Sequence, residues 1–100
     1  MLHTVNKSPF ASATLTQCLG HLTDGAAVLL IEDAVVGGVA GSASGALLAE
    51  CLKGHKVYCL GPDLMARGIS EGRLVKGIQM VDYAGFVRLV TEHDAVQSWL

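Results

Sequence analysis

Residues 26–31, with the sequence AAVLLI, form an unbroken apolar run that ends at Glu32 and Asp33. A strand that is buried on both faces of a parallel sheet has this composition, whereas a strand with one solvated face alternates apolar and polar residues. The run therefore predicts a central strand of a parallel sheet.

The segment before this run begins with a second strand candidate. Residues 2–5 are predicted to form a short strand, and the Asn-Lys-Ser-Pro sequence of residues 6–9 is a turn that ends it. A helix is expected from Ser12 or Thr14 to Thr23, because Ser and Thr are common capping residues and Asp24-Gly25 closes it. This order places the loop at the carboxyl edge of the sheet, where α/β folds hold their chemistry.

The rest of the chain alternates in the same way. We predict helices over residues 44–52, 64–67 and 84–92, and strands over residues 55–60, 79–82 and 96–100. Residues 34–46, which hold four of the twelve glycines, are expected to form a loose turn or a weak helix. Strands and helices in alternation, joined by short links, predict one α/β domain over residues 1–100. Its sheet of about five strands is mostly parallel and covered on both faces.

The composition favours an assembly over a free monomer. Hydrophobic residues make up 51% of the 100 residues and charged residues 16%, where about 25% charged is typical. A domain of 100 residues cannot bury that much apolar surface. We therefore expect an obligate oligomer, in which subunit contacts cover the remaining apolar surface. With a net charge of −2 and scattered Lys and Arg, direct nucleic-acid binding is not expected. No signal peptide or membrane span is recognised, so we expect a cytoplasmic protein without a membrane partner.

Cys18 is the first candidate for chemistry. Its helix carries apolar residues at i, i+3, i+4 and i+7 through Leu15, Cys18, Leu19 and Leu22, so the thiol lies on or beside the buried stripe. Burial as core is the favoured interpretation. The functional alternative rests on His21, one turn along, and on Lys7 in the preceding loop. Either could stabilise the reactive thiolate.

Other site types have weaker support. Cys59 lies near the carboxyl end of a predicted strand, where a role in the hydrophobic core has at least as much support as a role in a functional site. Cys51 lies on the leucine stripe of its helix and is expected to belong to the hydrophobic core. No CxxC and no paired histidine spacing occur, so neither a metal nor a disulfide framework is predicted. Residues 37–41 lack the GxGxxG spacing and the P-loop lysine, so no cofactor is predicted. Close backbone packing explains these glycines better than a small-molecule-binding module does.

Three blocks of the sequence resemble the DsrH/TusB family of sulfur-relay proteins: MLHTVNKSP, VYCLGPDLMARGI and VDYAGFVRLVTEHDAVQSWL. The resemblance spans essentially the whole chain in order and is closest to the DsrH branch of sulfur-oxidising bacteria. It implies a small three-layer α/β/α sandwich and a heterohexamer with DsrE/TusD-like and DsrF/TusC-like subunits. A DsrC/TusE-like sulfur carrier is the implied further partner.

The resemblance also implies two roles for the chain. In one, Cys18 matches a first-helix cysteine of the family and carries persulfide sulfur, in sulfur oxidation or in 2-thiolation of the tRNA wobble uridine. In the other, the chain is a non-catalytic subunit that shapes the interface while a cysteine of the DsrE/TusD-like partner carries the sulfur.

Overall fold

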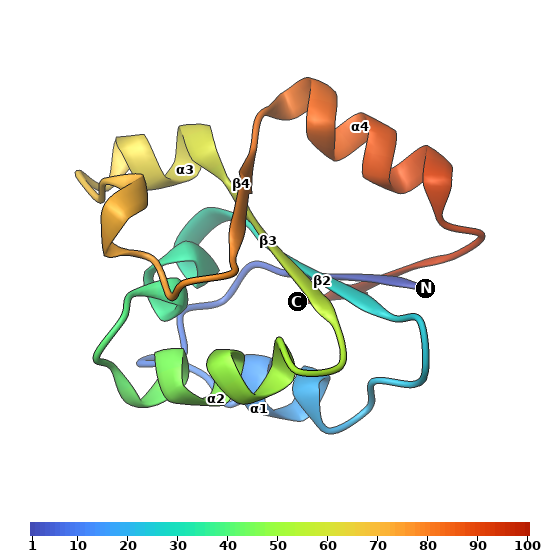
Figure 1. Ribbon diagram of the computed structural model, residues 1–100, viewed down its shortest axis with the longest axis horizontal. Coiled ribbons are helices and arrows are strands. Elements are labelled where there is room, and N and C mark those ends of the chain that lie inside the picture. Colours follow the sequence, from blue (N-terminus) through green and yellow to red (C-terminus); the bar gives the residue numbers. More distant parts are fainter.

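The computed structural model describes residues 1–100 and contains one sheet in which all five strands are parallel (Figure 1). The strand order is β4-β3-β2-β1-β5. The register aligns Leu2 of β1 with Ala27 of β2 and with Val96 of β5, and Ala27 with Lys56 of β3. The strands are β1 (Leu2–Val5), β2 (Ala27–Leu30), β3 (Lys56–Leu60), β4 (Gln79–Val81) and β5 (Val96–Trp99). This confirms the predicted α/β class and its parallel sheet.

The helices lie on both faces of this sheet. They are α1 (Thr14–Leu19), α2 (Ala43–Cys51), α3 (Gly61–Ala66) and α4 (Tyr83–Glu92), with short 3₁₀ helices η1 (Glu32–Gly38) and η2 (Glu71–Arg73). Figure 1 shows α1 and α2 on one side of the strands and α4 on the other. The strand order explains this, because right-handed crossovers that advance from β1 to β4 share one face. The return from β4 to β5 must therefore cross the opposite face.

Two hydrophobic clusters hold these layers together. The larger lies between the sheet and α1, α2 and α3, and joins Val28, Leu30 and Val57 to helix residues such as Leu15 and Leu48. The smaller lies under α4 and contains five buried residues: Leu2, Ala27, Leu29, Tyr58 and Leu89. The second face is therefore covered by one helix only.

The glycine-rich segment is ordered, and its glycines allow close packing. Residues 32–38 form η1, where only a loose turn or weak helix was expected. A Cβ at Gly37 would lie 3.1 Å from the Pro9 ring, and one at Gly45 in α2 would lie 2.5 Å from the Val39 carbonyl oxygen. Buried Ser44 donates a hydrogen bond to the Gly37 carbonyl at 3.0 Å. The packing interpretation of these glycines agrees with this structure.

Two helix boundaries differ from the predictions by three residues or more. The first helix ends at Leu19, with Gly20 as its C-cap, and does not continue to Thr23. The third begins at Gly61 and not at Leu64. Pro62 lies in its first turn, where a missing N–H costs nothing because the first amides of a helix have no intrahelical acceptor.

Candidate functional site

Cys18 lies in the core and not at the surface. The residue is 0% exposed and belongs to the cluster under α1 and α2. Burial raises the pKa of its thiol to about 12, with a smaller contribution from Cys51. A persulfide carrier needs an accessible thiolate. The isolated chain does not provide one at this position.

The two proposed thiolate stabilisers do not reach Cys18. His21 is exposed, its Nδ1–H donates to the Gln17 carbonyl at 2.7 Å, and its ring centroid lies 5.4 Å from that of Trp99. Lys7 is exposed in the loop after β1 and forms no ion pair. The i, i+3 spacing predicted that His21 would lie near the thiol. In the structure α1 ends at Leu19, and the His21 ring instead binds the Gln17 carbonyl in the last turn of this helix.

The other two cysteines differ in accessibility. Cys59 is 0% exposed, and burial raises the pKa of its thiol to about 12, with a contribution from Asp63. Cys51 is only half-buried, at an apolar groove of about 240 Å³ between the first two helices. Burial raises its pKa as well. Cys51 is therefore the most accessible thiol, which its place on a leucine stripe did not reveal.

The carboxyl edge of the sheet, where the chemistry was expected, is closed by polar contacts. Glu32 has a φ of +50°, in the left-handed region, and its N–H donates to Asp63 Oδ2 at 2.6 Å. Arg67 forms an ion pair with Asp33 at 2.7 Å. Asn6, which follows β1, has a buried Oδ1 without a hydrogen-bond partner. This edge holds backbone strain and an unpaired acceptor, but no cysteine with solvent access.

An apolar stripe on α4 faces solvent. Tyr83, Val87 and Val90 follow one another at i, i+4 and i+7 and are 62%, 63% and 37% exposed. The opposite face of the same helix packs Leu89 against the sheet. A helix with apolar residues on two faces is typical of one that is covered on both sides.

No group of three or more His, Cys, Asp or Glu side chains is arranged to hold a metal ion. None of the helices is both long enough and apolar enough to span a membrane.

Comparison with known proteins identifies the family. The DsrH family model, described as "DsrH like protein", matches residues 7–96. Protein TusB of Escherichia coli (strain SMS-3-5 / SECEC) is 38% identical over 101 positions, which cover 99% of this chain and 100% of that protein. The chain belongs to the DsrH/TusB family. Protein TusB of Escherichia coli strain K12 / DH10B is 36% identical over the same share of both chains.

Solved structures share the DsrH/TusB chain's fold at lower identity. The ychN protein of Escherichia coli superposes with a TM-score of 0.76 at 21% identity, over 97% of both chains. A protein of unknown function from Methanobacterium thermoautotrophicum superposes with a TM-score of 0.71 at 15% identity, over 97% of this chain and 95% of its own. These likenesses show the small α/β architecture and nothing about the chemistry.

Proposed function

We propose that this chain is the interface-shaping subunit of a cytoplasmic sulfur-relay complex of the DsrEFH/TusBCD type, in which a partner subunit's cysteine carries the sulfur. The relay would serve sulfur oxidation or 2-thiolation of the tRNA wobble uridine. Membership of the DsrH/TusB family supports the relay. The observation that carries the structural role is the complete burial of Cys18.

The chemistry of the relay sets the requirement that Cys18 does not meet. An acceptor thiolate attacks the outer sulfur of a donor persulfide, the donor's S–S bond breaks, and the donor leaves as a thiolate. The acceptor becomes the persulfide, so no outside oxidant or reductant is needed. The attack requires sulfur atoms in contact. Sulfur carriage by Cys18 stays a prediction, and it would require α1 to open first.

The exposed stripe on α4 supports the proposed partners. Tyr83, Val87 and Val90 would pack against the DsrE/TusD-like or DsrF/TusC-like subunits of a heterohexamer, because a stable interface needs an apolar centre. A DsrC/TusE-like carrier would then exchange sulfur with the partner's cysteine. Val87→Glu should preserve the monomer fold and weaken assembly of the complex in size-exclusion chromatography. If the Val87→Glu variant assembled normally, this face of α4 would not be part of the subunit interface.

The proposal is tested on the assembled complex with a persulfide donor. After loading, peptide mass spectrometry should find the added sulfur on a partner cysteine, with Cys18 unmodified. Cys18→Ala should retain sulfur transfer to the carrier, as should the matched variant Cys51→Ala. Persulfide on Cys18, together with loss of transfer in Cys18→Ala but not in Cys51→Ala, would replace the structural role with sulfur carriage.

A further inference from the structure

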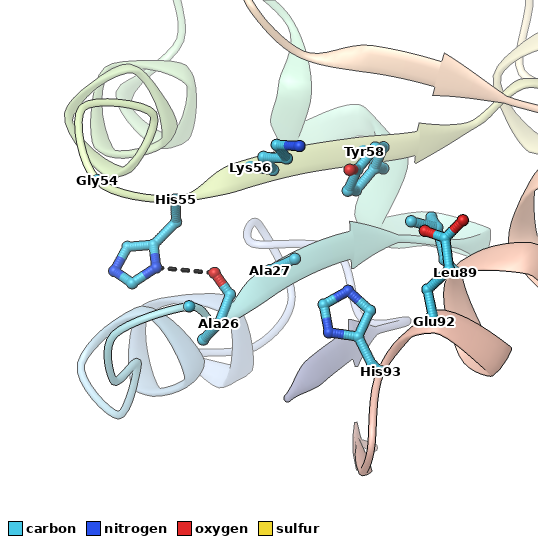
Figure 2. A pocket seen from close by; sticks show the side chains of 10 residues that line it. Ala26, Ala27, Gly54, His55, Lys56, Tyr58, Leu89, Glu92 and His93 are labelled. Atoms are coloured by element: carbon cyan, nitrogen blue, oxygen red, sulfur yellow. Dashed lines mark hydrogen bonds between the residues drawn. The ribbon is translucent and has the colours of Figure 1, made fainter.

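A cavity of about 380 Å³ opens at the edge of the sheet opposite to the loops of Asn6 and Glu32. It lies between the amino ends of β2 and β3 and the carboxyl end of α4, as Figure 2 shows. Ala27 and Leu89 provide its apolar floor. Because Ala27 is small and its neighbours in register are Leu2 and Lys56, the sheet is hollowed at this point. Cys18 does not line the cavity, and the groove beside Cys51 shares only His55 with it.

The wall formed by β3 presents hydrogen-bond donors. Tyr58 is only 8% exposed, lines the cavity, and its hydroxyl has no hydrogen-bond partner in the protein. Lys56, two residues earlier on the same face of the strand, forms no ion pair. The hydroxyl is not among the fully buried unpaired atoms, so it is reached from the cavity and not sealed in the core. It is therefore free to donate a hydrogen bond to an acceptor that binds in the cavity.

The wall formed by the end of α4 has the opposite character. Glu92 lines the cavity and has no ion-pair partner. The last turn of this ten-residue helix contains no basic residue, so the partial negative charge at its carboxyl end is not compensated by its own side chains. This wall favours a cation.

Two histidines complete the lining. The Nδ1–H of His55 donates to the Ala26 carbonyl at 2.8 Å, which holds the ring at the mouth of the cavity (Figure 2). His93 follows α4 directly, and in the view of Figure 2 its ring lies between Ala27 and the end of α4. Both rings can form further hydrogen bonds with a ligand.

We infer that this cavity binds a small zwitterion of the α-amino-acid class. Its carboxylate would lie against Tyr58 and Lys56, and its ammonium group against Glu92 and the carboxyl end of α4. A simple anion would meet the uncompensated Glu92, and a simple cation would meet Lys56, so only a ligand with both charges satisfies both walls. The apolar floor and the volume suit an aliphatic side chain. This site is independent of sulfur transfer.

The test uses the full chain and L-leucine as the probe. Two analogues each lack one charge: 4-methylpentanoate has no ammonium group, and 3-methylbutylammonium has no carboxylate. We expect saturable shifts of the Gly25, Ala27 and Gly54 amides in NMR titrations, with binding about tenfold tighter for leucine than for either analogue. The indole of Trp99, on the opposite face of the sheet, should not respond.

Variants with matched controls locate the site. Tyr58→Phe should weaken leucine binding about tenfold, and Lys56→Gln about threefold because this lysine is exposed and partly screened. Tyr83→Phe and Lys53→Gln, which change the same residue types outside the cavity, should bind normally. Equal binding of 4-methylpentanoate and leucine would make this an anion site and overturn the inference. So would the absence of saturation at about 50 mM, where even a millimolar site fills.

Discussion

The burial of Cys18 predicts a large difference in reactivity between the three cysteines. Burial raises the pKa of this thiol from 9.0 to about 12, so its thiolate fraction near neutral pH falls roughly a thousandfold. The higher basicity makes the remaining thiolate more nucleophilic, with a Brønsted slope of about 0.45, which restores roughly twentyfold. Alkylation of Cys18 should therefore be roughly fiftyfold slower than that of a free cysteine, before any steric protection is counted.

Timed alkylation of the native full chain measures this directly. Iodoacetamide is added at mildly alkaline pH, samples are quenched at intervals, and peptide mass spectrometry follows each cysteine separately. Cys51, the half-buried thiol beside the α1–α2 groove, should react first. Cys18 and Cys59, both 0% exposed, should react only as the structure opens. In denaturant the three rates should converge, which controls for local sequence effects.

One result would refute this reasoning. If Cys18 in the native chain reacted as fast as Cys51, while circular dichroism showed an intact fold, the thiol would be accessible through motion of α1. The burial argument for a structural role would then fail, and sulfur carriage by Cys18 would become the better explanation. Cys51→Ala, in which the neighbouring thiol is absent, would show whether reaction at Cys51 itself opens the helix.

Three further predictions concern stability. Gly45→Ala should lower the free energy of unfolding by about 1–3 kcal/mol, because its Cβ would meet the Val39 carbonyl oxygen at 2.5 Å. Gly72→Ala, with nothing within 4 Å of its Cβ, should change it by less than about 0.5 kcal/mol in the same denaturant titration; equal losses would contradict the packing argument. Asp82→Ala should cost about 1 kcal/mol by removing the N-cap of α4, whereas Asp82→Asn should keep most of it. Burial lowers the pKa of His3 below 6.5, and its neutral Nδ1 accepts the Trp99 indole N–H at 3.0 Å. The stabilisation of the fold by neutral His3 should therefore be present above pH 6.5 and be lost as the pH falls toward the lower folded-state pKa. His3→Asn, which keeps an acceptor but does not titrate, should flatten that loss in thermal unfolding measured against pH.

Local sequence patterns predicted the elements better than their ends. The strands predicted at residues 2–5, 26–31 and 55–60 are the three inner strands, and the continuous apolar run at residues 26–31 lies at the centre of the sheet. A loose turn or a weak helix was expected over residues 34–46, because Glu32 and Asp33 end the preceding strand and glycine disfavours helix, whereas a 3₁₀ helix forms over residues 32–38. Its support comes instead from distant residues such as Pro9, which packs against Gly37.

The candidate site shows a similar division. The helical phase of Leu15, Cys18 and Leu22 correctly favoured burial of the thiol. The predicted approach of His21 to the Cys18 thiol is wrong, because the imidazole donates to the Gln17 carbonyl and packs against the ring of Trp99. Trp99 lies 78 residues further along the chain, so no local pattern indicates this contact. The accessibility of Cys51 depends on how α1 and α2 sit against each other, which no local pattern contains.

By itself the sequence therefore predicted the parallel α/β class and favoured burial of Cys18, because periodicity and composition act over neighbouring residues. It indicated the family through the resemblance of three sequence blocks. The tertiary structure decided the rest. The strand order sends α4 across the opposite face of the sheet, so its last turn meets Ala27 and Tyr58 and leaves a cavity between them. That cavity exists only because segments about thirty residues apart in the chain are brought together by strand pairing, and pairing at that range is set by the packing of the whole domain.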